Sequence, residues 1–358
     1  MNLLFGMKDI GGANAVIPVA LKAIEGGNNY GILYCDGVSY DRFKDSYPSI
    51  STVCDPEKVF NWLKPEAVIT STCTPNENLI IPIKFVEMAH LLGIPVVAVQ
   101  DFWMSGMSVK WNIRPDKICV QDDLAKRLLL SYWEGYGEDD IVVTGQPAFD
   151  HLSGVDCHKA RTRLASKLGL TEQWPIIHLS GGFKGTAEAV EWTVKSLNRS
   201  RTSVYLLVRY HPKMVRPDAP LEWRDVYEKC KHLPSTLKHG KVIDSSFLTS
   251  SEVNAGADIV IGVYSTLLVE ACYLRKNCIS IITPEARSYF GMETGNMLSE
   301  FPPAMLEACF SVSSEDALTP DFWHSLFSQN TLCSEQERNF VTDGNSAKRV
   351  LDVVSSVI

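Results

Sequence analysis

The residues best placed for chemistry follow predicted parallel strands in the second half of the chain. Ser265 and Thr266 come soon after the mostly apolar, β-branched run 258–262 and open a predicted helix, and both residue types cap helix starts. A helix start offers free N–H groups and a partial positive charge, which suit a phosphate. Glu270 lies one turn further along the same face, where a carboxylate suits ribose hydroxyls. The stretch predicts a nucleotide clamp, although it also fits an ordinary βαβ unit with a solvated glutamate.

Two more polar segments follow predicted strands in this half. Ser180, Gly181 and Gly182 come after the strand 176–179 and offer small side chains and backbone N–H groups before a helix. Arg209 and His211 follow the strand 203–208, and a guanidinium can pair bidentately with a phosphate to which an imidazole also donates. The alternatives are a plain turn, a surface cation and a loop histidine. Because ligands of open parallel sheets bind outside the carboxyl ends of the strands, we expect these segments to hold a nucleoside mono- or diphosphate together.

The first half offers two candidate general bases. Asp9 follows the first predicted strand, and Asp101 follows the strand 96–100; either carboxylate could take a proton from an acceptor hydroxyl. A turn-stabilising role for Asp9 and a helix cap for Asp101 are the alternatives. We favour Asp9, because neighbouring glycines leave room for a substrate. The residues predicted to line the acceptor side are small, polar or aromatic: Gly11, Gly12, Asn14 and Trp103. Trp103 could stack on a sugar ring, although core packing is the commoner fate of tryptophan.

Strands and helices alternate along the chain with short connections, which predicts parallel sheets in a doubly wound α/β fold. The turn after the first strand, predicted to run to Asn14, lacks the GxGxxG fingerprint of dinucleotide-binding proteins. A Gly/Pro break at 144–150 predicts a domain boundary. We therefore expect domains at 1–146 and 147–340, an irregular loop at 284–303, and a last segment, 341–358, whose helix returns to the first domain.

The amino-acid composition limits the kinds of partner and cofactor that we expect. The 358 residues carry a net charge of −8, which argues against nucleic acid as the main partner. No apolar run approaches the roughly 20 residues that span a bilayer, and no signal peptide is evident. The ten cysteines show no metal-binding spacing, as in cytosolic proteins with reduced thiols. We expect a cytoplasmic protein with no metal and no cofactor, and leave peripheral membrane association open.

Four short motifs occur in the order in which a known superfamily carries them: VTGQPAFD (143–150), LSGGFKG (179–185), VRYHP (208–212) and VYSTLLVEA (263–271). They resemble segments of GT-B glycosyltransferases and their relatives. The greatest similarity is to CDP-glycerol glycerophosphotransferases, capsule-type CMP-sugar transferases and non-hydrolysing UDP-N-acetylglucosamine 2-epimerases. The resemblance implies two Rossmann-like doubly wound domains facing a central cleft. It also implies metal-independent chemistry, with His211 and Ser265-Thr266 at phosphate and Glu270 at ribose in the C-terminal domain.

The chain departs from the epimerase pattern in two places. A His-x-Glu-Ala-Gly-Leu-Arg segment is replaced by Val99-Gln100-Asp101-Phe102-Trp103, and a pair of glutamates by the single Glu270. We therefore expect an inverting glycosyltransferase that moves a sugar from a UDP- or CMP-type pyrimidine-nucleotide donor to a glycan, lipid-linked or protein acceptor in polysaccharide or cell-envelope assembly. In it, His211 would stabilise the departing phosphate. The alternatives are a nucleotide-sugar 2-epimerase or hydrolase, a CDP-glycerol-type polyol phosphate transferase, and a non-catalytic nucleotide-sugar-binding protein.

Overall fold

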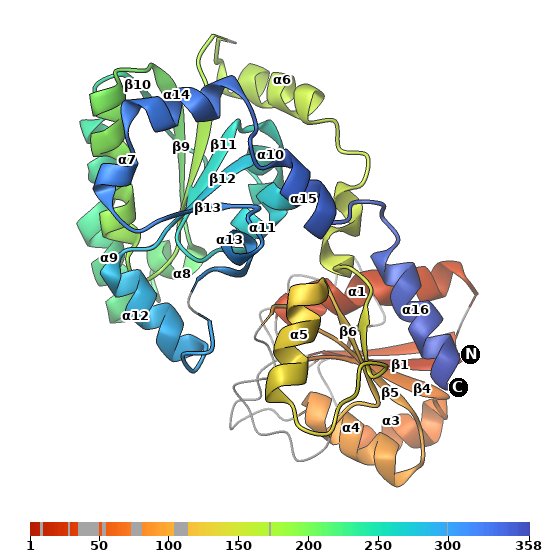
Figure 1. Ribbon diagram of the computed structural model, residues 1–358. Coiled ribbons are helices and arrows are strands. Elements are labelled where there is room, and N and C mark those ends of the chain that lie inside the picture. The colour runs from red at the N-terminus through yellow and green to blue at the C-terminus, as the bar shows by residue number, and fades with distance from the viewer. Residues whose placement is uncertain are drawn as a thin grey trace. The chain divides into compact units, whose positions relative to one another are not determined.

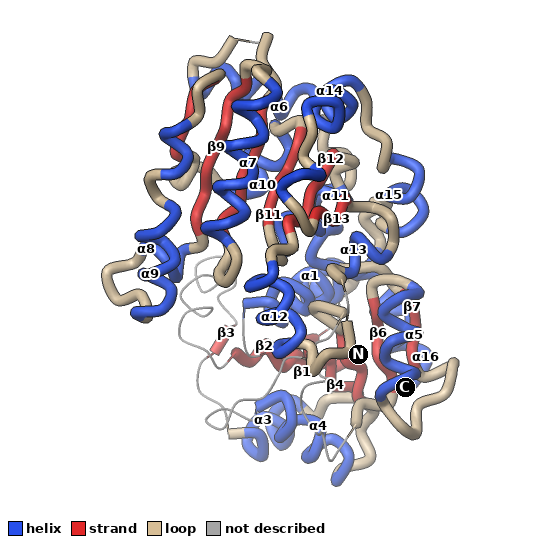
Figure 2. Tube along the Cα trace, turned by 60° about the vertical axis from the view of Figure 1, so that its left-hand side comes forward, coloured by secondary structure: helices blue, strands red, loops and turns tan. Residues whose placement is uncertain are grey.

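The chain forms two compact units, which we call the first unit (Met1–Ser153 with Thr342–Ile358) and the second unit (Gly154–Val341) (Figure 1). In both units, strands lie between layers of helices (Figure 2). The computed structural model describes residues 1–7, 10–27, 29–34, 50–51, 55–72, 81–103, 114–171, 173–298 and 300–358.

The first unit is built on a sheet in which every described strand pair is parallel. Its strand order is β3-β2-β1-β4-β5-β6-β7, so the direction of winding reverses between β1 and β4. Strands β4 and β5 are fully buried, because helices cover both faces of the sheet. The strands are β1 (Asn2–Met7), β2 (Asn29–Tyr34), β3 (Ile50–Ser51), β4 (Ala67–Ser71), β5 (Val96–Val99), β6 (Lys117–Val120) and β7 (Ile141–Val143).

The helices of the first unit are α1 (Ile10–Glu25), α3 (Pro56–Leu63), α4 (Ile81–Leu91), α5 (Asp123–Tyr132), the 3₁₀ helix η1 (Pro147–Leu152) and the returning α16 (Ser346–Val357). Helix α1 corrects one prediction. The glycine-rich turn expected to reach Asn14 is wrong, since the helix already begins at Ile10. Gly12 is buried in its first turns beside Ala13, so packing of small side chains outweighs the low helix propensity of glycine.

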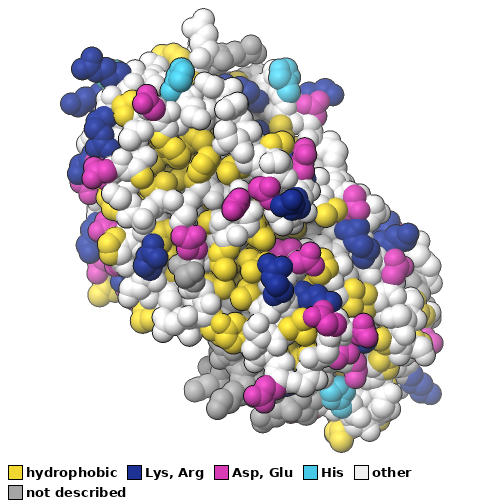
Figure 3. All heavy atoms as spheres, in the orientation of Figure 1, with side chains coloured by type: hydrophobic (Ala, Val, Ile, Leu, Met, Phe, Trp, Pro, Cys, Tyr) yellow, Lys and Arg dark blue, Asp and Glu magenta, His cyan; other side chains and the backbone are white. Residues whose placement is uncertain are grey.

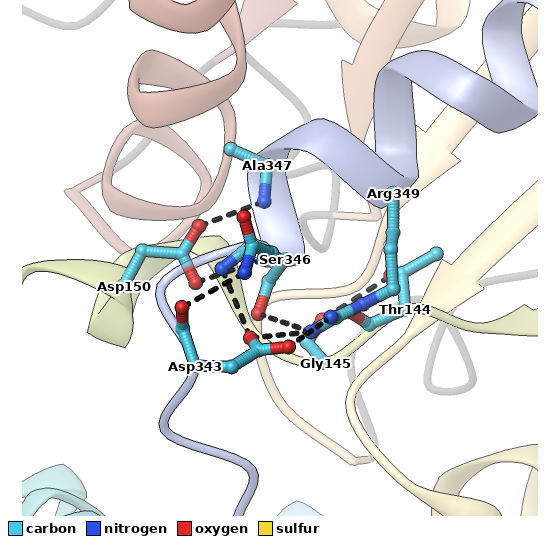
Figure 4. A network of polar contacts seen from close by, with 8 residues as sticks. Thr144, Gly145, Asp150, Asp343, Ser346, Ala347 and Arg349 are labelled. Atoms are coloured by element: carbon cyan, nitrogen blue, oxygen red, sulfur yellow. Dashed lines mark hydrogen bonds and ion pairs between the residues drawn. The ribbon is translucent and has the colours of Figure 1, made fainter. Parts of the chain in front are cut away.

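The segment around the predicted domain boundary holds the C-terminal helix in the first unit (Figure 4). Both carboxylate oxygens of Asp150 accept backbone N–H groups at the start of α16, from Ser346 (3.0 Å) and Ala347 (2.8 Å). Arg349 on α16 donates through Nε to the backbone oxygen of Thr144 (2.6 Å). A carboxylate facing a helix N-terminus is favourable for both charge and hydrogen bonding. The boundary expected at 146/147 accordingly lies at 153/154.

Gly145 allows this close approach. Its φ of +82° belongs to the left-handed region, and a Cβ atom there would lie 2.6 Å from Oγ of Ser346. Beyond the anchor, α16 buries Ala347, Val350 and Val354 in the core formed with α1.

Replacing Asp150 with alanine should lower the free energy of unfolding of the first unit by about 2 kcal/mol, because two helix-terminal N–H groups lose a charged acceptor. Equilibrium urea denaturation measures the change. Asp352→Ala is the matched control, since Asp352 is an exposed carboxylate on the same helix. Equal destabilisation by both variants would contradict the anchoring role.

The second unit repeats the architecture around a sheet of order β10-β9-β8-β11-β12-β13, again with parallel pairing. The winding reverses between β8 and β11. The strands are β8 (Ile176–Gly181), β9 (Val204–Tyr210), β10 (Gly240–Asp244), β11 (Ile259–Gly262), β12 (Asn277–Ile281) and β13 (Phe310–Val312). The predicted α/β class with two doubly wound sheets is confirmed.

Helices cover both faces of this sheet. The helices are α6 (Cys157–Leu168), α7 (Thr186–Ser200), α8 (Pro212–Val215), α9 (Leu221–Cys230), η2 (Leu233–Thr236), α10 (Ser250–Gly256), α11 (Thr266–Tyr273), α12 (Pro284–Glu293), α13 (Pro302–Met305), η3 (Glu315–Ala317), α14 (Pro320–Ser328) and α15 (Cys333–Asn339). Helices α7, α9 and α14 share one core with the sheet, and α6, α10 and α11 pack together elsewhere (Figure 1). The prediction of an irregular loop at 284–303 is wrong for its first half, which forms helix α12. Thr283 caps α12 by accepting the N–H of Ala286 (3.2 Å), and Pro284 occupies the first helical position.

The distribution of surface charge and the apolar character of the helices are relevant to binding partners and to membranes. On the face drawn in Figure 3, basic and acidic side chains are interspersed. No helix in the described part of the chain combines the length and apolar character needed to cross a bilayer.

Candidate functional site

The carboxyl edge of the second sheet brings together three of the predicted segments. β8 neighbours both β9 and β11, so the residues that follow these strands emerge side by side at the point where the winding reverses. The β8–β9 pairing continues past the strand ends, since the N–H of His211 donates to the backbone oxygen of Gly181 (3.0 Å). Open α/β sheets bind ligands at such points.

Ser180 and Gly181 belong to strand β8 rather than to the loop after it. Ser180 is buried, with 6% of its surface exposed. A Cβ atom on Gly181 would lie 2.6 Å from the ring of Tyr210, so this glycine makes room for a packed side chain. The prediction that these two residues offer their groups to a phosphate is therefore not supported by their position.

The loop 182–185 satisfies part of its own hydrogen-bonding capacity. The N–H of Gly182 donates to Oγ1 of Thr186 (3.0 Å), and that of Gly185 donates to Oε2 of Glu285 (2.9 Å). The two amides between them donate to no acceptor among the described residues. The loop thus retains the N–H groups of Phe183 and Lys184 for an anion, whereas the prediction names Gly182.

Arg209 fastens a neighbouring loop. Its Nη1 donates to the backbone oxygens of Ser245 (3.3 Å), Ser246 (3.4 Å) and Leu248, all in the connection after β10. Nε and Nη2 make no hydrogen bond within the described ranges. The bidentate phosphate contact predicted for Arg209 is therefore restricted to these two nitrogens, and its first role in the structure is to hold the loop.

His211 presents a hydrogen-bond donor at this edge. Its Nδ1 accepts the backbone N–H of Lys213 (3.1 Å), so the neutral ring carries its proton on Nε2. Burial of the ring and the nearby ammonium of Lys213 lower the pKa of His211 below its ordinary value. The residue as a whole is exposed, but Trp223 covers one side of the ring, with the ring centres 5.1 Å apart. At neutral pH, His211 is an uncharged donor with its Nε2–H available.

Helix α11 begins as predicted. Oγ of Ser265 accepts the N–H of Leu267 (3.2 Å), which uses one of the terminal amides. Thr266 is exposed at the first helical position, and its N–H donates to no acceptor in the described part of the chain. The helix start therefore keeps an amide and a hydroxyl for an anionic group.

Glu270 lies deeper than the nucleotide clamp requires. Only 4% of its surface is exposed, and Oε2 accepts Nδ2 of Asn254 (3.0 Å). The same Nδ2 donates to the backbone oxygen of Leu267 (3.0 Å), while Oδ1 of Asn254 lies 2.6 Å from Nδ1 of His178. We call Glu270, Asn254 and His178 the Asn254 network. It uses part of the Glu270 carboxylate inside the unit, and contact with ribose stays a prediction.

Comparison with known proteins identifies the fold. No protein-family model matches the sequence, and no curated protein matches it either. Among solved structures, a UDP-GlcNAc 2-epimerase from Neisseria meningitidis bound to UDP-GlcNAc is similar at TM-score 0.66 and 13% identity, over 99% of this chain and 100% of that one. MurG from Acinetobacter baumannii is similar at TM-score 0.60 and 14% identity, over 99% and 100% of the two chains. A glycosyltransferase from Rickettsia africae gives 0.61 and 14%, over 99% and 97%.

The chain has the GT-B fold. The predicted resemblance to the GT-B superfamily is confirmed at the level of architecture. At these identities the likeness establishes the fold, and activity has to be argued from the site.

The candidate bases of the first GT-B unit are only partly described. Asp9 lies outside the described residues. Asp101 is partly buried just after β5, and its backbone oxygen accepts Nε2 of Gln146 (3.2 Å). The predicted acceptor-side role of Trp103 is wrong, because its side chain is 1% exposed and Nε1 donates to both oxygens of Asp122 (3.1 and 2.9 Å).

The remaining acceptor-side candidates, Gly11, Gly12 and Asn14, lie in the first turns of α1. Gly11 is exposed, Gly12 is buried and Asn14 is half-buried. Gly12 therefore contributes to packing, while Gly11 and Asn14 remain predictions for the acceptor side. Within the described ranges, no group of three or more His, Cys, Asp or Glu side chains is arranged to hold a metal ion.

Sequence reasoning misses His178 and Asn254, which carry no motif. The available signal is polarity in a buried setting: His178 stands inside an apolar strand, and Asn254 stands in the buried C-terminal half of α10. Burial lowers the pKa of His178 to about 4, against 6.5 in a free side chain, and the cation of Arg209 adds to the effect.

Because folded His178 resists protonation, this residue should make the protein less stable as the pH falls from about 6.5 to about 4. Between pH 7 and pH 4, the wild type should lose roughly 3 kcal/mol more unfolding free energy than His178→Gln, which keeps an amide donor for Asn254 but does not titrate. Urea denaturation across this range measures the difference. Equal pH slopes for the two proteins would contradict the neutral, buried state of His178.

Proposed function

We propose that this protein is a glycosyltransferase that uses a pyrimidine-nucleotide sugar as donor. The reaction needs no metal ion and inverts the anomeric carbon of the transferred sugar. The observation that carries the proposal is the set of donors at the carboxyl edge of the second sheet. It comprises the N–H and hydroxyl of Thr266, Nε2–H of His211 and the two amides of the loop 182–185. Groups of this kind stabilise negative charge as it develops on a departing nucleotide phosphate.

The solved relatives support a nucleotide-sugar ligand. The Neisseria meningitidis epimerase with the same fold was solved bound to UDP-GlcNAc, and a Staphylococcus aureus relative was solved with UDP. We extend this ligand class to the present chain and place the diphosphate at Thr266 and His211. Arg209 would reach it through Nε or Nη2, and contact between Glu270 and ribose stays a prediction from the sequence.

The proposed chemistry needs a base on the acceptor side. The acceptor molecule attacks the donor sugar through a hydroxyl group. The proton of that hydroxyl has to pass to a carboxylate within hydrogen-bond reach. Asp9 is our first candidate and Asp101 our second, with a glycan, lipid-linked or protein acceptor. Assembly of polysaccharide or cell-envelope material is the corresponding role.

The second candidate function is a nucleotide-sugar 2-epimerase or hydrolase. The similarity to UDP-GlcNAc 2-epimerases favours it. Against it stand the replacement of the His-x-Glu segment by Val99-Gln100-Asp101-Phe102-Trp103 and the burial of Trp103 within that segment. The transferase is therefore our preferred function.

His211→Ala should weaken UDP binding about tenfold, because the diphosphate loses one hydrogen-bond donor, a loss of about 1.4 kcal/mol. His211→Gln places an amide near the position of Nε2 and should retain most of the affinity. Isothermal titration calorimetry with UDP, CMP and CDP measures both variants. Unchanged affinity in His211→Ala would argue against the phosphate assignment.

Thr266→Glu should weaken nucleotide binding at least tenfold more than Thr266→Gln, a side chain of the same size without charge. A carboxylate at the first helical position occupies the region of positive potential that we assign to phosphate and repels an incoming anion. The same titration measures this pair. If both substitutions have equal effects, bulk rather than charge is responsible and the helix start does not hold phosphate.

Incubation with UDP-GlcNAc and other pyrimidine-nucleotide sugars, followed by product analysis, separates the candidate functions. A transferase should leave the donor intact until an acceptor is added. Release of an epimer or of free nucleotide without acceptor would favour the epimerase or hydrolase. Transfer of a polyol phosphate from CDP-glycerol would identify the polyol phosphate transferase. Tight binding with no turnover under any condition would favour the non-catalytic binding protein.

A further inference from the structure

A separate pocket lies at the opposite edge of the second sheet. It has a volume of about 400 Å³, within the range of small-molecule sites. Its lining includes Pro175, Asp258 and Asn277, which stand at or just before the starts of β8, β11 and β12. The candidate nucleotide site is at the carboxyl ends of these strands, so the pocket, which we call the amino-edge pocket, is distinct from it.

The amino-edge pocket carries an excess of positive charge. Its lining contains the cations Arg161, Arg275 and Lys276 but only one carboxylate, Asp258. That carboxylate is already engaged, since it pairs with Arg161 and accepts the backbone N–H of Ile176 (2.7 Å). The charge that remains in the pocket is therefore cationic.

Lys276 is the cation best placed to attract a ligand. Lys276 is half-buried, and within the described ranges its ammonium forms no ion pair. Partial burial lowers the pKa of Lys276 below its ordinary value, although nearby Asp258 and a hydrogen bond with Cys157 act in the opposite direction. A half-buried cation that forms no close ion pair loses part of its hydration, and an anion that enters the pocket would offset that loss.

Asn277 also lines the pocket, and its side-chain oxygen has no hydrogen-bond donor among the described residues. The residue is 4% exposed, and its Nδ2 donates to the backbone oxygens of Leu326 (2.9 Å) and Gln329 (2.9 Å). These two bonds fix the orientation of the amide, and Oδ1 is left buried with no donor among the described residues. An unsatisfied buried acceptor is unfavourable by about 1–3 kcal/mol, so a hydroxyl donor here would be stabilising.

We propose that the amino-edge pocket binds a small polyhydroxylated anion of the sugar phosphate class, with its anionic group at Lys276 and a hydroxyl donating to Oδ1 of Asn277. Trp174 and Pro175 give the pocket an apolar wall for the carbon face of a sugar ring. The proposal does not depend on the proposed function, because it uses neither His211 nor Thr266.

Calorimetric titration of the full chain with glucose 6-phosphate, inorganic phosphate and glucose, at constant ionic strength, tests the proposal. Glucose 6-phosphate should bind more tightly than phosphate, because its sugar hydroxyls can donate to Asn277 while its phosphate stays at Lys276, and neutral glucose should bind weakest. Lys276→Met should weaken glucose 6-phosphate binding at least tenfold, and Lys276→Arg should retain most of it. Lys229→Met, which removes an exposed lysine on α9, should leave binding unchanged.

Three outcomes would overturn the proposal: no binding to the wild type at millimolar glucose 6-phosphate, equal loss in both methionine variants, or loss in His211→Ala with retention in Lys276→Met. The last would place the anion at the nucleotide edge. If Lys276→Met does not fold, the ¹⁵N indole resonance of Trp174 in the wild type, assigned with Trp174→Phe, gives a second readout. It should shift on addition of glucose 6-phosphate and stay unchanged with glucose, and a resonance that does not respond to glucose 6-phosphate would count against the site.

Discussion

The buried amide of Asn254 is the constraint on which the candidate site depends. Asn254 belongs to helix α10, and its side chain connects that helix to two other elements of the second unit. It bonds to strand β8 through His178 and to helix α11 through Leu267 and Glu270. Asn254 itself is fully buried, in a setting where an unpaired polar group is costly. The network therefore fixes α11 against the sheet, and with it the helix start that offers Thr266.

The same network shows why local sequence reasoning predicts the elements around the candidate site but not the contacts of its residues. The strands and helices are readable because hydrophobic periodicity and capping residues are local signals, as at Ser265 before α11 and Asp122 before α5. The partners of Arg209 and Glu270 come from loops and helices far along the chain, and no spacing rule indicates them. Trp103 illustrates the ambiguity: an aromatic residue after a strand can be a ligand platform or, more commonly, part of the core. The hydrogen bonds to Asp122 decide for the anchor.

The motifs that resemble GT-B sequences divide into two kinds in the structure. VTGQPAFD provides Thr144, Gly145 and Asp150, all of which contact the start of α16, so this motif has a structural task. LSGGFKG and VYSTLLVEA combine packing positions with groups that stay available to a ligand. Helix α12 was missed because its signal is brief, a capping threonine followed by Pro284, inside a segment with weak periodicity. Resemblance thus selects candidate segments, but hydrogen-bond partners are needed to assign a role to each residue.

The returning helix α16 also has a consequence for how the protein is made. The first unit takes part of its core from Ala347, Val350 and Val354, which a ribosome adds only after the whole second unit has been synthesised. Domains generally fold as units during translation, and usually the earlier one folds first. Here the order is reversed, because the second unit is continuous in the chain and the first is not. During translation the apolar face of α1 therefore stays uncovered until α16 has been synthesised. A chaperone bound at this stage would shield that face from aggregation.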